Sequence, residues 1–272
     1  MQHLSRLSHI NKEIETIMKH GRNHISTWLP GLAAAVLATA MPARAVNVLW
    51  TDWQTGNPGG GTASGQIVTP STTVNVSYSN PQGYAFFQDG SGFDYFRNDL
   101  GAVGSPYTSS VVDNMPTPGE MIGLYRSGFQ TLSFSETIAN PFFSYVSLNG
   151  NGYAFDRDFD VLSFGDASDP EGPNYPGNWG SGTSYKVDLG VGTYRYVLMG
   201  TGEPHGTIRF KGAFDSVTWQ SLSDEYWNGF TVGIEGTARE VFPTPDAGAT
   251  LPLLGFALGG FALMRRRFNP AA

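Results

Sequence analysis

Three aspartates alternate with other residues near the middle of the chain, at Asp156, Asp158 and Asp160. In a β-strand, alternate side chains lie on one face at intervals of ~6.5–7 Å, so these carboxylates would form a row. Three like charges repel one another unless solvent or a cation lies between them, and calcium prefers about six to eight oxygen ligands. The pattern therefore has two interpretations, a calcium site or a solvated strand face. The EF-hand spacing is absent, because no glycine follows Asp160.

Further acidic groups follow at Asp166, Asp169 and Glu171, in a segment rich in Pro, Gly and Asn. They could complete an acidic rim with the three aspartates, or they could lie in a solvated loop.

His205 is the only histidine after residue 45 and is expected in a polar turn. A single histidine makes neither a metal cluster nor a catalytic triad without a placed nucleophile. No pair of carboxylates is singled out for glycoside hydrolysis. We therefore expect no enzyme, and no cofactor other than calcium.

Tryptophans raise the possibility of carbohydrate binding, because flat aromatic faces stack on sugar rings. Trp219 alternates with Val217 and is expected to lie in the core. Trp179 lies in a glycine-rich segment and is the predicted exposed platform. The other tryptophans considered for this role are Trp50, Trp53 and Trp227.

The central part of the sequence has the pattern of a β protein. Apolar residues alternate with polar ones, or run in short blocks bounded by Gly, Pro, Asn and Asp. Val74, Val76 and Tyr78 share a face because strand side chains repeat every two residues. The predicted strands cover residues 46–53, 65–69, 72–79, 84–88, 121–126, 130–138, 142–148, 153–164, 185–189, 193–199, 206–210, 214–220 and 230–235.

Turn residues predict how these strands connect. Asn149–Gly152 contains Asn-Gly twice, which is a strong hairpin signal. Residues 190–192 and Gly212 predict further hairpins. Residues 90–118 are weakly patterned and are expected to be a long surface loop with at most one helical turn near 95–100. The many short strands predict an all-β domain, a two-sheet antiparallel β-sandwich of jelly-roll type, with a helix in each terminal segment.

The N-terminal segment has the features of a secretory signal peptide. Residues 25–40 are mostly apolar, follow Lys19 and Arg22, and precede an A-x-A pattern formed by Ala43 and Ala45. We expect signal peptidase to cleave after Ala45. The charged segment before Met18 is long for such a leader, so Met18 is the expected true start. An N-terminal membrane anchor that is never cleaved is the alternative.

The C-terminal segment has the features of a membrane helix. Residues 247–264 contain no charge, and 18 residues (264 − 246) at ~1.5 Å each span ~27 Å, close to the bilayer core. The arginines that follow favour keeping this end in the cytoplasm. A buried core helix is the alternative. The predicted membrane-stop residues are Arg265, Arg266 and Arg267.

This tail resembles the PEP-CTERM family of sorting signals, in the variant where Pro-Asp replaces Pro-Glu-Pro. The matching residues are Pro245, Asp246, Gly248, Thr250 and Leu251, with the glycine-containing helix and the arginine cluster. The resemblance covers about the last tenth of the chain and implies recognition by an exosortase in a Gram-negative bacterium, with removal of the helix. The preceding domain also resembles ectodomains found upstream of such tails, at residues 50–53, 140–141, 206–210 and 227–234. Most of these ectodomains have no assigned function. The expected organisation is 1–45 leader and signal peptide, 46–236 extracellular β-sandwich, 237–246 linker and sorting motif, 247–264 membrane helix and 265–272 basic tail.

Charge limits the partners of the exported part. Between Val46 and Pro245 there are 20 Asp and Glu against 8 Lys and Arg, a difference of −12. Such a surface repels nucleic acid and anionic lipid, so we expect no nucleic-acid partner. The chain has no cysteine, which excludes disulfides and thiolate metal sites.

Together these features predict an exported surface or extracellular-matrix protein with a structural or adhesive role near an extracellular polysaccharide. A carbohydrate-binding module, with or without calcium, is the alternative, and a glycan-active enzyme is a third. The expected processing partners are signal peptidase and an exosortase. The precursor is expected in the inner membrane during transit, and the mature protein at the cell surface or outside the cell.

Overall fold

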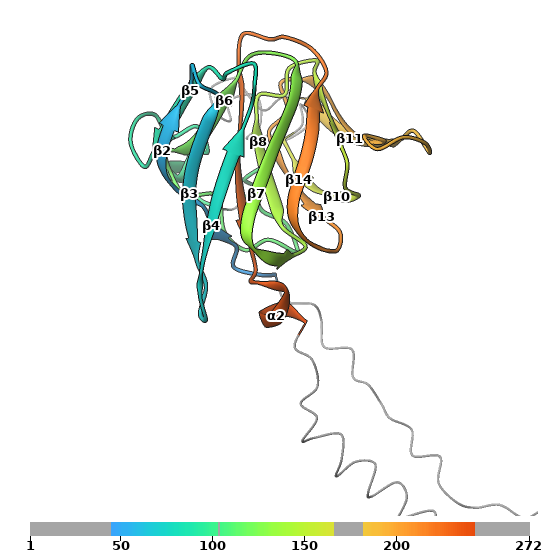
Figure 1. The fold of residues 1–272 in the computed structure, drawn as a ribbon. Coiled ribbons are helices and arrows are strands. Elements are labelled where there is room, and N and C mark those ends of the chain that lie inside the picture. The colour runs from blue at the N-terminus through green and yellow to red at the C-terminus, as the bar shows by residue number, and fades with distance from the viewer. Residues whose placement is uncertain (1–44, 103, 166–181, 243–272) are drawn as a thin grey trace, which may run out of the picture. The chain divides into compact units, whose positions relative to one another are not determined.

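The computed structural model describes residues 45–102, 104–165 and 182–242, which fold into two stacked β-sheets (Figure 1). One sheet consists of β1 (Leu49–Trp50), β5 (Phe86–Asp89), β6 (Glu120–Leu124), β8 (Phe142–Val146), β10 (Phe159–Phe164), β13 (Gly206–Phe210) and β15 (Asn228–Ile234). The other consists of β2 (Asp52–Asn57), β3 (Thr62–Val68), β4 (Thr73–Ser79), β7 (Gly128–Ala139), β9 (Gly152–Phe155), β11 (Gly182–Asp188), β12 (Tyr196–Gly202) and β14 (Ala213–Ser221).

The strand order in the 7-stranded sheet is β10-β13-β8-β15-β6-β5, with β1 paired to β15. The order in the 8-stranded sheet is β11-β12-β9-β14-β7-β4-β3-β2. All of these strand pairs are antiparallel. The predicted all-β, two-sheet antiparallel sandwich is therefore confirmed.

Alternation of polar and apolar residues determines which face of each strand is buried. In β4, Val74, Val76 and Tyr78 are buried, while the residues between them are exposed. Leu132 of β7 also points into the core, and so does Trp219 of β14, as the sequence predicts. A sheet with one buried face and one solvent-exposed face requires this alternation of apolar and polar residues.

Aromatic rings fill the space between the two sheets. Phe143 of the 7-stranded sheet stacks on Phe230 at 4.9 Å between ring centroids, with an interplanar angle of 5°. Phe143 also makes edge-to-face contacts with two rings of the opposite sheet, Phe155 and Trp219, each at 5.6 Å between ring centroids. Offset and edge-to-face contacts of this kind add to the free energy gained by burying the rings.

Two predicted hairpins and one predicted strand are wrong for the same reason: in each case the chain passes from one sheet to the other. The Asn149–Gly152 segment does not close a hairpin, because β8 pairs with β13 and β15 whereas β9 pairs with β12 and β14. The turn at Gly212 likewise joins β13 and β14, which lie in different sheets. The predicted strand over residues 153–164 is two strands, β9 and β10, separated by a bend at 156–158, and they also lie in different sheets. These segments carry the chain from one sheet to the other.

The predicted hairpin at residues 190–192 is confirmed as β11–β12, and β3 and β4 form a second hairpin. The first predicted strand, residues 46–53, ends too early, because β2 continues to Asn57 and pairs with β3. In Figure 1 the β11–β12 hairpin projects sideways from the sandwich.

The long segment between β5 and β6 covers a second hydrophobic cluster instead of lying in solvent. Its Phe96 and Tyr107 are fully buried with Met121 and Val146 of the 7-stranded sheet. The expected helical turn is present as a 3₁₀-helix, η1 (Asn98–Leu100). The outer face of the 7-stranded sheet is therefore partly covered by this segment.

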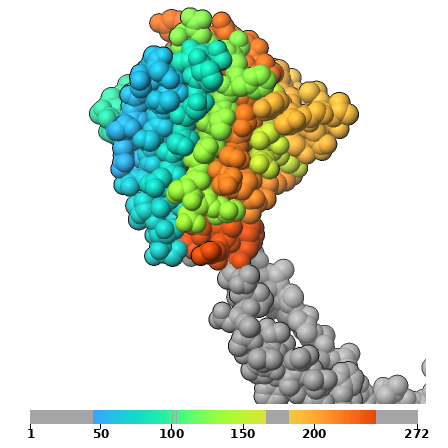
Figure 2. Space-filling view, in the orientation of Figure 1, coloured from blue at the N-terminus to red at the C-terminus, as the bar shows by residue number. Residues whose placement is uncertain are grey.

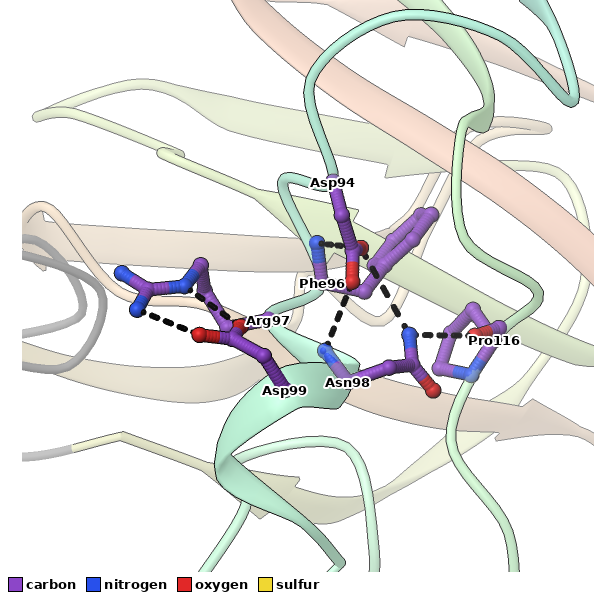
Figure 3. Close-up of polar contacts among 6 residues, drawn as sticks. All are labelled: Asp94, Phe96, Arg97, Asn98, Asp99 and Pro116. Atoms are coloured by element: carbon purple, nitrogen blue, oxygen red, sulfur yellow. Dashed lines mark hydrogen bonds and ion pairs between the residues drawn. The ribbon is translucent and has the colours of Figure 1, made fainter.

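Hydrogen bonds to the Asp94 carboxylate fix the start of this segment (Figure 3). Its carboxylate accepts the backbone N–H groups of Phe96 at 3.0 Å and Asn98 at 2.7 Å. The Asn98 side chain donates to the carbonyl of Pro116 at 3.0 Å, which joins the two ends of the segment. Arg97 forms an ion pair with Asp99 at 2.8 Å.

A short helix, α2 (Ala238–Val241), follows the last strand at one end of the sandwich (Figure 1). Thr237 and Glu240 form a capping box, and Glu240 also accepts hydrogen bonds from Ser71 at 2.6 and 3.0 Å. Within residues 45–102, 104–165 and 182–242, no helix has the length and apolar character needed to cross a membrane. The predicted signal peptide and C-terminal membrane helix lie outside the described residues.

Glu120 gives a test of the packing. Only 4% of this residue is exposed, and its carboxylate accepts the N–H of Trp53 at 2.7 Å. Burial raises the pKa of Glu120 from 4.5 to about 7. A carboxyl with a raised pKa reduces stability progressively as pH rises from its unfolded value toward its folded value. We predict that Glu120→Gln, which keeps an acceptor for Trp53, stabilises the protein by ~1–3 kcal/mol at pH 8 and by much less at pH 4.5.

Urea denaturation at the two pH values measures this difference. Glu136→Gln, which changes an exposed glutamate on β7, is the matched control and should shift stability by less than ~0.5 kcal/mol. A loss of stability in Glu120→Gln at pH 8 would contradict the prediction.

Candidate functional site

The outer face of the 8-stranded sheet carries rows of hydroxyl groups. Ser64, Ser77, Ser133 and Ser216 lie directly opposite one another on β3, β4, β7 and β14. A second row, one step along the same strands, consists of Thr62, Ser79, Thr131 and Thr218. All eight residues are exposed or half-buried. We call these two rows the hydroxyl face.

The hydroxyl face is regular and contains no charged residue. Neighbouring strands are ~4.8 Å apart and side chains on one face repeat every ~6.5–7 Å, so the hydroxyls form a grid. Each hydroxyl can both donate and accept hydrogen bonds. Asn75 on β4 adds a side-chain amide to the grid, and its backbone N–H donates to the Ser135 hydroxyl at 2.9 Å. These eight residues are uncharged although the domain is strongly acidic, and a carboxylate contacts them at the β14 side, where the Ser216 hydroxyl donates to Asp215 at 3.3 Å.

The next part of the same face is apolar. Opposite Phe129 of β7 lies Gln220 of β14, followed across the sheet by Ala154, Val197 and Val187. A groove of about 470 Å³ lies over these strands, lined by Ala154, Tyr185, Val187, Leu189, Tyr194, Val197, Met199, Gln220 and Leu222. Figure 2 looks onto the hydroxyl face, with the projecting β11–β12 hairpin at its right.

Two tyrosines give this apolar groove a specific chemistry. Tyr185 is 46% exposed, and Tyr194 lies 5.0 Å from the exposed ring of Phe129. Gln220 is the one side-chain amide in the lining. A polar ligand could stack on the rings here but would find most of its hydrogen-bonding partners on the adjoining hydroxyl face.

A separate, polar pocket lies at the ends of strands from both sheets. Its volume is about 170 Å³, and its lining consists of Ser147, Asn149, Glu203, Glu225, Tyr226 and Trp227. Ser147 and Asn149 follow β8, Glu203 follows β12, and the last three residues precede β15. The crossing of the chain between sheets brings these segments together.

Hydrogen bonds connect this pocket to the core. The buried hydroxyl of Tyr153 donates to Asn228, whose amide donates to Glu225 at 2.7 Å. Asn149 bridges the two glutamates: its backbone N–H donates to Glu225 at 3.2 Å and its side-chain amide donates to Glu203 at 3.0 Å. The two carboxylates are thus held by one residue, although they are far apart in sequence.

Burial raises the pKa of Glu225 to about 7. Hydrogen bonds from Asn151, Asn228 and Asn149 favour the ionised form and oppose this effect, whereas the charge of Glu203 adds to it. Within the described part of the chain, neither glutamate forms an ion pair with Lys or Arg.

Aromatic rings line the other side of the pocket. Tyr226 is 95% exposed. Trp227 is half-buried, with its ring 4.8 Å from Tyr95 and 5.4 Å from Phe86. Phe86 lies close to the backbone because the opposing residue is Gly123, where a Cβ would come within 2.4 Å of its ring. Tyr95 follows Asp94, so the contacts in Figure 3 also support the ring that packs on Trp227.

The aspartates of the predicted calcium site do not form a row on one strand. Asp156 and Asp158 lie in the bend before β10, and only Asp160 lies in that strand. Asp156 accepts the N–H of Thr218 at 2.9 Å, which ties the bend to β14. The expected geometry is therefore wrong.

Basic side chains contact the other two aspartates. Asp158 pairs with Lys186 of β11 and lies 3.5 Å from Lys211, and Asp160 lies 2.7 Å from Lys211. Burial opposes ionisation of Asp158, but the lysines lower its pKa on balance. No cluster of three or more His, Asp or Glu side chains suited to a metal ion is found among the described residues. Calcium binding stays a prediction.

His205 differs from the expected polar turn residue. It is fully buried, and its Nδ1 accepts the N–H of Ser147 at 2.7 Å. Burial lowers the pKa of His205 to about 3, so the imidazole is neutral. It supports the backbone of Ser147, whose φ is 55°.

The tryptophans considered for carbohydrate binding differ in burial. Trp53 and Trp219 are in the core and Trp50 is buried, so none of these three is an exposed platform. Trp227 lines the polar pocket of Glu203 and Glu225. Trp179, with Asp166, Asp169 and Glu171, lies outside the described residues, as do the sorting-motif residues and Ala43.

Comparison with protein families identifies the tail. Residues 245–268 match the VPDSG-CTERM motif. The match covers 24 residues (268 − 245 + 1) of the 272, so it concerns the sorting signal and not the β-sandwich. This PEP-CTERM-like motif indicates export, surface anchoring and exosortase-type processing. Comparisons with curated proteins and with solved structures give no significant match.

Sequence reasoning missed the pair Glu203 and Glu225, and it did not choose Trp227. The run Glu225-Tyr226-Trp227-Asn228 combines carboxylate, aromatic and amide groups, which is a usable signal. The hydroxyl face was also missed, because its rows depend on the register between strands.

Tyr153 tests the hydrogen-bonded connection between core and pocket. Tyr153→Phe leaves the oxygen of Asn228 without its donor, and Asn228 is only 1% exposed. An unsatisfied buried acceptor costs ~1–3 kcal/mol, so we predict a loss of that size in chemical denaturation. Tyr185→Phe, which removes a hydroxyl from a half-exposed ring, is the control and should change stability by less than ~0.5 kcal/mol. Equal effects of the two substitutions would contradict the prediction.

Proposed function

We propose that this exported protein binds an uncharged polysaccharide across the outer face of its 8-stranded sheet and acts as an adhesive or structural component of an extracellular layer. The observation that carries the proposal is the hydroxyl face, which is uncharged, regular and continuous with the groove that contains Tyr185 and Tyr194. Polysaccharides present the matching chemistry, since their hydroxyls need hydrogen-bonding partners and their ring faces stack on aromatic side chains.

The arrangement suits an extended ligand better than a small one. Each exposed hydrogen bond contributes little, because it replaces a bond to water. A polymer that contacts several rows at once gains from many such contacts after the first has formed. The groove supplies apolar contact at one side, where Val187 and Leu222 would cover the carbon-bound hydrogens of a sugar ring.

We expect binding without turnover. The hydroxyl face offers no acid or base within its two rows, and hydrolysis of a glycosidic bond requires two suitably placed carboxylates.

The proposed path of the protein follows from its two terminal segments. Signal peptidase would cleave after Ala45, and the predicted apolar helix at 247–264 would hold the precursor in the inner membrane. Exosortase-type processing at the motif of residues 245–268 would then release the domain or attach it outside the cell.

Thr131 and Thr218 test the proposed surface. Their hydroxyls lie 3.5 Å apart at the β7–β14 end of the second row, and valine has nearly the same shape as threonine. We predict that Thr131→Val with Thr218→Val weakens binding to a neutral polysaccharide by at least ~tenfold, because two donors and two acceptors are lost. Pull-down with insoluble neutral polysaccharides and titration with soluble ones measure this loss, using the full chain purified in detergent.

Thr117→Val is the control, because Thr117 is exposed in the segment before β6, outside the hydroxyl face. It should leave binding unchanged. If the double variant binds as well as the parent protein while Thr117→Val does too, the hydroxyl face is not the binding surface. If the parent protein binds no neutral polysaccharide, the proposed function is wrong.

The path of export has a separate test. We predict that the mature protein recovered from cells begins at Val46 and ends near Asp246, since both terminal segments would be removed. Mass spectrometry of its two termini measures this directly. An unprocessed chain recovered from the cytosol would contradict the proposed path.

A further inference from the structure

The pocket between Glu203 and Glu225 has a chemistry that the hydroxyl face lacks. Its lining combines two carboxylates, an exposed tyrosine and a half-buried tryptophan around a hollow of about 170 Å³. This is smaller than the ~300–1,000 Å³ typical of sites for drug-sized ligands, so it suits one small group.

Hydrogen bonding makes the pocket selective for a donor. The N–H groups of Asn149 and Asn228 are already directed at the two glutamates. Each carboxylate has about four lone-pair positions, so oxygens of both glutamates retain capacity to accept. A ligand group entering here would therefore be a hydrogen-bond donor.

The charge of the pocket indicates that the hydrogen-bond donor of the ligand is positively charged. Within the described residues no Lys or Arg pairs with either glutamate, and the exported part of the chain has a charge difference of −12. Two carboxylates without a cation attract a positive group, and the faces of Tyr and Trp rings do the same. An ammonium group carries three donors and one positive charge, which fits all of these features.

The pocket lies at the end of strands that also form the groove. Val197 and Met199 of β12 line the groove, and Glu203 follows directly after that strand. Leu222 lines the groove as well, three positions before Glu225. A polymer bound over β12 and β14 would therefore have a residue near this end of the sandwich.

We propose that the pocket of Glu203, Glu225, Tyr226 and Trp227 binds the free ammonium group of an amino sugar that occurs in an otherwise uncharged polysaccharide. This rests on the proposed function, and it names the class of sugar that the protein selects. The ammonium lies between the two carboxylates and against an aromatic ring, and the ring hydroxyls of the sugar remain on the side of the groove. An N-acetylated sugar loses the charge and carries a bulkier group, so it binds less well.

Titration calorimetry of the full chain in detergent, near pH 7 and at low salt, tests the proposal. The probes are glucosamine oligosaccharides with free amines and their fully N-acetylated counterparts of the same length. We expect the free-amine form to bind at least ~tenfold more tightly. Glu203→Gln and Glu225→Gln should each weaken binding of the free-amine form by ~tenfold, and should leave the N-acetylated form nearly unchanged.

Glu136→Gln is the matched control, since it removes the same charge from an exposed site on β7. If Glu136→Gln weakens binding as much as the pocket variants do, attraction by the net charge explains the preference and the pocket proposal is wrong. Glu203 is half-exposed, so its variant tests the pocket even if Glu225→Gln disturbs folding.

Equal binding of the two probes overturns the ammonium proposal and leaves polysaccharide binding in place. Binding of neither probe, together with failure to bind any neutral polysaccharide, overturns both.

Discussion

The packing of aromatic rings between two sheets is the interaction on which the rest of this structure depends. The chain has no cysteine, so no disulfide holds the sheets together. Phe143, Phe155, Trp219 and Phe230 contact one another across the interior and are almost completely buried. Burying a large side chain of this kind contributes ~1.5–3 kcal/mol, and many such residues share the core. With the inner faces used in this way, function is left to the outer faces and to the loops.

The two outer faces are used differently. The segment that contains Phe96 and Tyr107 packs on the 7-stranded sheet and buries a second cluster. The 8-stranded sheet keeps an open face, with hydroxyl rows on β3, β4, β7 and β14 and an apolar groove beyond them. The segments that cross between the sheets end together near Asn149 and form the acidic pocket. One open surface and one small pocket are thus consequences of the same two-layer topology.

Much of the fold could be predicted from the sequence, because strand alternation reports directly on burial. The pattern of Val74, Val76 and Tyr78 predicted both a strand and its buried face, and the β11–β12 hairpin followed from the turn residues at 190–192. Turn residues do not indicate which sheet the next strand joins, so the Asn149–Gly152 segment was mistaken for a hairpin. Glu203 and Glu225 were missed for the same reason, since only these crossings bring them together. The serine and threonine rows require the register between strands, which no single strand contains.

Hydroxyl-radical footprinting with a bound neutral polysaccharide tests the central claim, that the open face of the 8-stranded sheet is the binding surface. Exposed aromatic residues lie on this face at Phe129 and Tyr185, and elsewhere at Phe93 and Phe242. The account predicts that the polysaccharide protects Phe129 and Tyr185 from oxidation and leaves Phe93 and Phe242 unchanged. Protection of Phe93 or Phe242 without protection of Phe129 and Tyr185 would contradict it.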